Sequence, residues 1–289
     1  EAGRIASDPA PSWWLAERAL ATIAGSLAEA KYAIIDGFLP QSEVSALAAI
    51  AREAQSMDLL EAGTHYGVGA WLGPPEDNRG DWQNRKAVPH KWSARGDHLG
   101  FFADSDAGGL PGLRCLTCAV DSLVSALAVR GNADETASRL RAVCLREDTM
   151  IACYSGKLRG RYLRHLDADR GAELTAILYL NEDWCEADDG CLRIYHIGRD
   201  NRRVRVDLMP SWNRLVLFWA GIECPHEVLP TRRDRLAMTC WYVDARSALS
   251  APGGLARVVP GHGPKLNPVS PWTWESVFAV AGVNEEAAR

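Results

Sequence analysis

The second half of the chain, from Thr149 to Asp244, contains eight short segments that have the character of β-strands. Each segment is rich in β-branched or aromatic residues and ends at a turn. They are TMIACYSG, RYLRHLD, ELTAILYLN, GCLRIYHI, RVDLMPSW, RLVLFWAG, HEVLP and RLAMTCWYVD. Eight strands at this spacing, after a helix-rich first half, predict a β-sandwich or jelly roll with helices packed on one face.

The first half supplies the helices that such a core needs. Residues 13–30 and 40–57 are rich in Ala, Leu and other helix formers, and the strand-like KYAIIDGFL lies between them. Two more helices are expected at about 109–130 and 133–147. We therefore expect an α+β fold that is mainly β in its core and is supported by N-terminal helices.

Two segments do not fit this plan. Residues 63–98 are rich in Gly, Pro, Trp and charge, and loops of such length are usually functional or disordered. A satellite core is one interpretation, but we prefer a lid that closes over a substrate. A Pro- and Gly-rich C-terminal extension, 246–289, has one short helical end. We expect a single domain over 1–289, with helical support and lid in 13–147 and the strand core in 149–245.

Composition limits the partners. The chain has 32 Lys and Arg against 37 Asp and Glu, a net charge of −5, with no long run of either sign. Neither nucleic acid nor an anionic membrane is therefore expected as a partner. No apolar run is expected to reach the ~18 residues of a membrane span, and no secretory signal is visible.

The cysteines give a hint about the compartment. Most of the eight lie inside apolar segments, which is typical of buried free thiols. Cys115 and Cys118 have no second Cys or His pair at zinc-finger spacing, so we expect them to pack in a helix. These observations favour a protein of the cytoplasm or nucleus. We also expect a monomer.

One predicted strand carries a histidine and an acid two residues apart, His165 and Asp167. Residues i and i+2 of a strand point to the same face, so both side chains would project into the mouth of a barrel. Non-haem Fe(II) oxygenases bind their metal with two histidines and one carboxylate. His226, in CPHEVLP, is the candidate for the second histidine. The alternatives are a surface strand pair and a structural histidine at a strand start.

Arg235 is a candidate for binding an acidic cosubstrate. The turn PTRRD after His226 leads into RLAMTCWYVD, so a hairpin would place Arg235 opposite His226. A 2-oxo acid that chelates a metal leaves its far carboxylate for a bidentate cation, and a guanidinium suits this task. Thr239 and Tyr179 could add hydroxyl donors, and Tyr154 is a polar aromatic on the strand that precedes the His165 strand. A surface charge and core packing are the alternatives.

These segments resemble a known family. MIACYSG, YLRHLD, AILYLNEDW, DGCLRIY, RLVLFWAG, PHEVLP and RLAMTCWYVD, in this order, are similar to the 2-oxoglutarate- and Fe(II)-dependent prolyl 4-hydroxylases, most closely to the soluble branch of the hypoxia-inducible-factor prolyl hydroxylases. The resemblance covers about residues 149–245. It implies a double-stranded β-helix (jelly roll) that hydroxylates a prolyl residue of a protein or peptide at the 4-position, in an oxygen-sensing role. Fe(II), 2-oxoglutarate and O2 would be required, succinate and CO2 released, and ascorbate would keep the iron reduced.

The resemblance also implies roles for single residues. Those implied to hold the iron are His165, Asp167 and His226. Those implied to hold the cosubstrate are Arg235, Tyr179, Thr239 and Tyr154. Those implied to lie along the peptide substrate are Trp241, Ile177, Arg95 and Asp97.

The sequence departs from its relatives at Glu173, where they tend to carry an arginine near the substrate. This difference leaves the identity of the peptide open. The same chemistry on another side chain or a free amino acid, and a catalytically silent binding module on the same fold, are the alternative functions.

Overall fold

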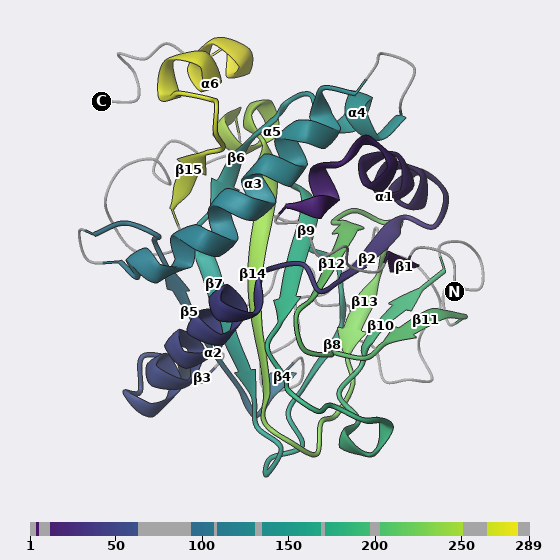
Figure 1. Cartoon of the computed structure of the whole chain (residues 1–289), viewed down its shortest axis with the longest axis vertical. Coiled ribbons are helices and arrows are strands. Elements are labelled where there is room, and N and C mark those ends of the chain that lie inside the picture. Colours follow the sequence, from purple (N-terminus) through teal and green to yellow (C-terminus); the bar gives the residue numbers. More distant parts are fainter. Residues whose placement is uncertain are drawn as a thin grey trace.

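The computed structural model describes residues 4–5, 12–62, 94–106, 109–130, 135–168, 171–196, 203–250 and 265–282. Within these residues the strands form two sheets that face each other, and the helices gather on one side (Figure 1). Every strand pairing described is antiparallel except that of β1 with β2. The predicted mainly β core with supporting helices is therefore confirmed.

The larger sheet has ten strands. Its main path, in spatial order, is β1 (Arg4–Ile5), β2 (Tyr32–Asp36), β12 (Arg214–Trp219), β9 (Ala172–Tyr179), β14 (Arg235–Asp244), β7 (Thr149–Tyr154), β5 (Asp97–Phe102) and β3 (Glu61–Ala62). Off this path, β6 (Val143–Glu147) pairs with β14 and with β15 (Leu266–Pro268). The smaller sheet runs in the order β11 (Val204–Leu208), β10 (Leu192–Tyr195), β13 (His226–Val228), β8 (Arg161–His165) and β4 (Ala94–Arg95).

All eight strands predicted from the second half of the sequence are present, as β7 to β14. Four of them, β7, β9, β12 and β14, lie in the larger sheet, and β8, β10, β11 and β13 lie in the smaller one. The hairpin expected between β13 and β14 is wrong. β13 pairs with β8 and β10, whereas β14 pairs with β6, β7 and β9, so residues 229–234 cross from one sheet to the other.

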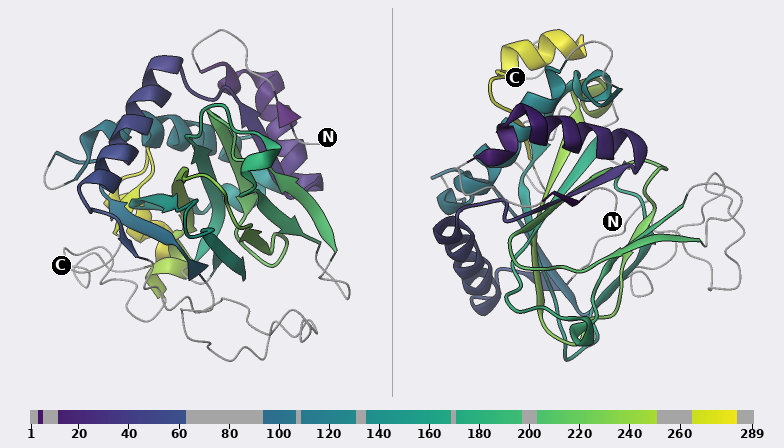
Figure 2. Two further views of the ribbon diagram at one scale, coloured as in Figure 1. Left: turned by 90° about the horizontal axis from the view of Figure 1, so that it is seen from below. Right: turned by 45° about the vertical axis from the view of Figure 1, so that its right-hand side comes forward.

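The helices cover the outer face of the larger sheet, as both views of Figure 2 show. They are α1 (Glu17–Glu29), α2 (Gln41–Ser56), α3 (Arg114–Ala128) and α4 (Glu135–Leu140). In α1 the apolar residues Leu20, Ile23 and Leu27 recur every three or four positions and are buried against the sheet. The helix expected over 133–147 ends at Leu140. Residues 143–147 form β6 instead, because all five are buried within the sheet.

Short elements complete the described chain. Three are 3-10 turns, η1 (Trp13–Leu15), η3 (Pro111–Leu113) and η5 (Glu186–Asp188). In the C-terminal extension, α5 (Ala245–Ser250) and α6 (Trp274–Ala281) share a small apolar core with β6 and β15. The predicted lid falls largely on residues 63–93, which lie outside the described residues.

One helical stretch corrects an expectation. Pro111–Ala128 reaches 18 residues with a mean hydropathy of 1.2, so its length and composition alone would allow a membrane span. Of this window, 44% is buried inside the protein. Leu116, Val120 and Leu123 belong to the main apolar core. We interpret the stretch as a core helix, for which burial against the sheet explains the apolar content.

Strand alternation separates this core from the interior between the sheets. On β9, Leu174, Ala176 and Leu178 join the core under the helices, whereas Ile177 and Tyr179 join a second cluster between the sheets. Successive side chains of a strand point to opposite faces, which explains the division. Two of the predicted site residues, Ile177 and Tyr179, therefore lie on the inner face of the larger sheet.

Candidate active site

Three side chains that could bind a metal meet between the sheets. His165 ends β8 and His226 begins the neighbouring β13, and the two residues are partners in the strand register. His165 Nε2 lies 3.4 Å from Asp167 Oδ1, and His226 Nε2 lies 3.7 Å from the same oxygen. One ligand atom from each of the three lies within 4.8 Å of the others. Two imidazole nitrogens and one carboxylate oxygen are the donor set of the non-haem Fe(II) oxygenases.

Backbone carbonyls set the orientation of both rings. His165 Nδ1 lies 2.9 Å from the carbonyl oxygen of Leu163, and His226 Nδ1 lies 2.9 Å from that of Cys224. A hydrogen bond at Nδ1 leaves the lone pair of a neutral imidazole at Nε2, which faces Asp167. Burial, followed by the proximity of His165, lowers the pKa of His226 from 6.5 to about 4. The ring is therefore neutral near pH 7 and ready to bind a metal.

A threonine holds the carboxylate. Thr175 Oγ1 donates a 2.8 Å hydrogen bond to Asp167 Oδ2, which leaves Oδ1 turned toward the histidines. Burial alone would raise the pKa of Asp167, but His226, His165 and the indole of Trp241 together hold it well below its usual range. Asp167 is therefore ionised, as a metal ligand must be.

Arg235 lies between the sheets and is only 2% exposed. Its Nε donates a 2.9 Å hydrogen bond to the carbonyl oxygen of Gly190. The guanidinium carbon lies 5.2 Å from the ring centroid of Tyr154 and 4.9 Å from that of Tyr179. Among the residues that the structure describes, none provides a carboxylate within ion-pair distance of this cation. A buried cation without a counter-charge is costly, so the arrangement favours an anionic ligand.

Tyr179 supports the same interpretation. Its side chain is fully buried, and its hydroxyl has no hydrogen-bond partner in the described structure. Burial raises the pKa of Tyr179 despite the nearby guanidinium of Arg235, so the phenol keeps its proton. A buried hydroxyl normally finds a partner, and here the guanidinium beside it would share a bound carboxylate.

Four other predicted residues lie on the inner face of the same sheet. Thr239 is 3% exposed and pairs with Ile177 of β9. Tyr154 pairs with Arg235 across β7 and β14. Trp241 is partly exposed, and its ring centroid lies 6.0 Å from that of Phe101. The structure thus places these residues together on the inner face of the larger sheet, while their roles stay predictions.

Of the two upstream residues that the resemblance places along the peptide, Asp97 is described with its side chain and Arg95 only through its backbone. Asp97 begins β5, is 4% exposed and pairs with Tyr154 in the strand register. Arg95 lies in β4 and pairs with Arg161 of β8, but its side chain lies outside the described part of the chain. Glu173, where the relatives tend to carry an arginine, forms an ion pair with Arg139 at 2.5 Å.

Sequence reasoning missed three residues that shape the metal site. One is Thr175, which shares a face of β9 with Tyr179 and donates a hydrogen bond to Asp167. The rings of Tyr162 and His165 lie 4.5 Å apart, and those of Phe218 and His226 lie 4.6 Å apart. Tyr162 lies three residues before His165 in β8, a spacing that places side chains on opposite faces of a regular strand, so the strand pattern gave no signal for it. Phe218 comes from β12, and no sequence pattern links it to β13.

The arrangement of the two histidines and the aspartate agrees with comparisons to known proteins. Residues 149–243 match the family described as the 2OG-Fe(II) oxygenase superfamily. These residues form a 2OG-Fe(II) oxygenase domain. They include the three metal-site residues and Arg235, so the resemblance noted in the sequence is confirmed.

Named relatives of this oxygenase domain are prolyl hydroxylases. The chain is 39% identical over 109 residues to prolyl hydroxylase EGLN3 of Homo sapiens, a stretch that is 37% of this chain and 44% of that protein. The match thus spans less than half of the curated relative. A structure of a prolyl hydroxylase in complex with a hypoxia-inducible factor oxygen degradation domain peptide fragment, from Trichoplax adhaerens, is similar with a TM-score of 0.61 and 25% identity, over 84% of this chain and 99% of that one. A Pseudomonas putida prolyl-4-hydroxylase gives 0.56 and 28%, over 78% and 98%.

Proposed function

We propose that this protein is a 2-oxoglutarate- and Fe(II)-dependent dioxygenase that hydroxylates a prolyl residue of a protein or peptide at the 4-position. The observation that carries the proposal is the buried Arg235 guanidinium. It has no carboxylate partner in the described structure and lies beside the unpartnered hydroxyl of Tyr179. We also propose that the eight core strands, divided between the two sheets, form a double-stranded β-helix or jelly roll.

The spacing of the two ends of the site suits a short dicarboxylate. Thr175, which touches Asp167, and Tyr179, which touches Arg235, are four residues apart on β9, or about 13 Å between their Cα atoms. Side chains that lean inward from both ends shorten this span. A five-carbon acid with a keto group at one end could then reach from the metal ligands to the guanidinium.

The residues of the chain have separate tasks in this proposal. His165, Asp167 and His226 would hold Fe(II), which with bound 2-oxoglutarate and O2 supplies the oxidising chemistry and yields succinate and CO2. Arg235 and Tyr179 would bind the C5 carboxylate and so fix the orientation of the keto acid, with Thr239 as a further donor. The apolar interior around Ile177 excludes water from the reacting atoms.

The prolyl substrate is supported by the relatives. The curated relative is named a prolyl hydroxylase, and the Trichoplax adhaerens structure contains a peptide of hypoxia-inducible factor. Trp241 and Phe101 lie together on the partly exposed side of the site, where a peptide could approach. An oxygen-sensing role, ascorbate as reductant, a monomeric state and a location in the cytoplasm or nucleus belong to the same proposal.

The test combines product analysis with two variants. The protein is incubated with Fe(II), 2-oxoglutarate, O2 and proline-containing peptides, and succinate release and the mass of each peptide are measured. We expect succinate and a gain of one oxygen atom on proline, both absent in Asp167→Ala. An oxygen on another residue only would replace the prolyl assignment by the same chemistry on that side chain. Metal-loaded protein that releases no succinate with any peptide would refute the dioxygenase.

A further inference from the structure

Trp241 lies opposite an irregularity in the sheet that the contacts define closely. Thr239 of β14 pairs with Met150 of β7, and Tyr242 pairs with Arg146 of β6. Two residues of β14, 240 and 241, lie between these pairs. Three residues, 147–149, lie between them on the opposite side, where β6 runs into β7. This is a β-bulge, and bulges next to active sites change the direction of side chains.

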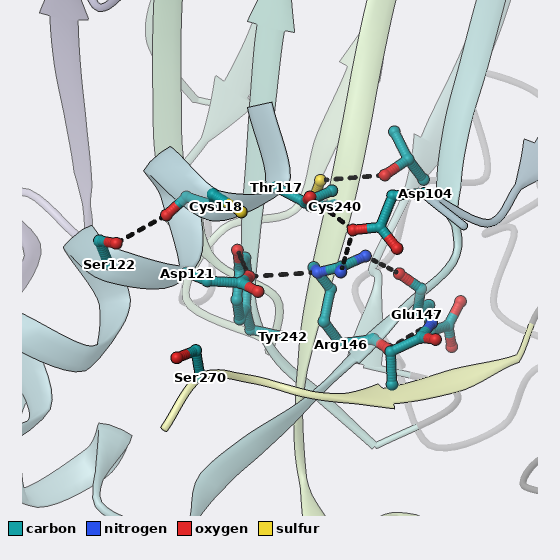
Figure 3. Close-up of polar contacts among 12 residues, drawn as sticks. Asp104, Thr117, Cys118, Asp121, Ser122, Arg146, Glu147, Cys240, Tyr242 and Ser270 are labelled. Carbon is teal, nitrogen blue, oxygen red and sulfur yellow. Dashed lines mark hydrogen bonds and ion pairs between the residues drawn. The ribbon is translucent and has the colours of Figure 1, made fainter. Parts of the chain in front are cut away.

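The bulge is held from the helix side by a buried ionic network (Figure 3). Arg146 Nη1 donates to the carbonyl oxygen of Glu147, within the bulge, at 3.2 Å. Its Nε lies 3.1 Å from Asp121 Oδ1 of α3, and its Nη2 lies 3.1 Å from Asp104 Oδ2, just after β5. The Tyr242 hydroxyl donates to the same Asp121 oxygen at 2.6 Å. The network therefore joins β14, β5 and α3 on the face opposite Trp241 and Phe101.

The C-terminal extension holds the bulge from its other side. Asp148 is 7% exposed, and its backbone N–H donates to the carbonyl oxygen of Lys265 at 2.8 Å. Its carboxylate accepts hydrogen bonds from the Lys265 N–H at 2.9 Å and from Asn267 Nδ2 at 3.0 Å. β15 continues this contact by pairing with β6. Both β6 and β15 lie outside the residues that match the oxygenase family, 149–243.

We infer that Arg146 and Asn267 are positioning residues, which hold the bulge at residues 147–149 and so aim Trp241 at the peptide entrance of the site. This inference rests on the proposed function for its kinetic consequence. The ring of Trp241 touches Phe101, and both strands that carry these rings are fixed by the same network. The C-terminal extension thus acts on peptide recognition through Trp241, whose indole also lies beside the metal ligand Asp167.

The kinetic test uses Asn267→Ala, which removes one close, partly buried hydrogen bond, to Asp148 Oδ1 at 3.0 Å, and two 3.5 Å hydrogen bonds to the carbonyl oxygens of Arg146 and Lys265. We expect an about five-fold rise in the KM for a proline peptide, the size of one lost hydrogen bond, with no change in the KM for 2-oxoglutarate. The matched control is Thr136→Val, which removes the buried hydrogen bond that the Thr136 hydroxyl donates to the carbonyl oxygen of Ala24, on the helix side. This control should leave both KM values unchanged. In a Trp241→Phe background Asn267→Ala should add no further rise. An equal further rise there would overturn the inference.

A spectroscopic test does not depend on activity. The protein is labelled with 5-fluorotryptophan, and the 19F resonance of Trp241 is the one missing from Trp241→Phe. We expect this resonance to shift in Asn267→Ala and, more strongly, in Arg146→Met, but to stay in place in Thr136→Val. An unmoved resonance in folded Asn267→Ala would overturn the inference, whatever the activity. A shifted resonance in a protein that hydroxylates no peptide would support the positioning and overturn only the proposed function.

Discussion

Replacing Arg235 by methionine should change ligand binding and stability in opposite directions. The guanidinium is 2% exposed and, among the described residues, has no carboxylate partner when the ligand is absent. Methionine keeps an apolar stem of similar length and removes the charge. Because an unpaired buried charge is costly, the ligand-free Arg235→Met protein should be at least as stable as the parent.

The same substitution should weaken the binding of 2-oxoglutarate. Removing one partner of a buried, hydrogen-bonded charge pair costs about 2–5 kcal/mol. The Kd for 2-oxoglutarate should therefore rise by about 30-fold or more, since about 1.4 kcal/mol corresponds to a factor of ten. The hydroxyl of Tyr179 remains as a donor and is the reason that binding is weakened but not abolished.

The assay is isothermal titration of the Mn(II)-loaded protein with 2-oxoglutarate under anaerobic conditions, together with thermal unfolding with and without the ligand. Arg193→Met is the control, because Arg193 is a partly exposed arginine that forms a 2.7 Å ion pair with Asp207 across β10 and β11. It should leave the Kd unchanged. An Arg235→Met protein that binds 2-oxoglutarate as tightly as the parent would refute the assignment of the cosubstrate anchor.

Three further predictions follow from the site and the core. Thr175→Val removes the hydrogen bond to Asp167 Oδ2 and should weaken metal binding by about ten-fold in a Mn(II) titration, whereas Thr136→Val should not. The pKa of His226 is about 4 in the folded protein and 6.5 in the unfolded chain, so the unfolded state binds more protons between these pH values. The free energy of unfolding of the metal-free protein, measured by denaturant titration, should therefore fall as the pH is lowered from about 6.5 to 4. His226→Gln should reduce this loss. Burial raises the pKa of Cys153 and Cys224 to about 12, so thiol labelling of the folded protein should reach the exposed Cys118 and Cys185 and spare these two; labelling of Cys153 at the rate of Cys118 would contradict the core packing.

The metal ligands could be predicted because local geometry carries most of the information. The i, i+2 spacing predicted that His165 and Asp167 turn to the same side, and they do so although β8 ends at His165 and Asp167 lies just beyond it. The order of the surrounding segments identified His226 and Arg235. The position of Arg235 relative to His226 could not be predicted from local geometry. A short turn between two strands suggests a hairpin, but residues 229–234 cross between the sheets. There Leu229 N–H bonds to Cys191 O, and Thr231 bridges to Asp189. These are long-range contacts that no local pattern encodes.

β6 shows the same limit for the fold. Residues 143–147 follow a helix-forming segment and contain Leu, Arg and Glu, so composition favours a continued helix. Burial between β14 and β15 decides for a strand. The bulge that follows depends on a partner more than a hundred residues away, Asn267, and could not be recognised from the sequence of either segment alone.

A crystal structure of the protein grown with Mn(II) and 2-oxoglutarate without oxygen tests the central claim most directly. The account predicts one anomalous peak bonded to His165 Nε2, His226 Nε2 and a carboxylate oxygen of Asp167, at about 2.0–2.2 Å from each ligand. It also predicts the far carboxylate of 2-oxoglutarate on the guanidinium of Arg235, within hydrogen-bond distance of the Tyr179 hydroxyl. A metal bound elsewhere, or a ligand whose far carboxylate avoids Arg235, would contradict it.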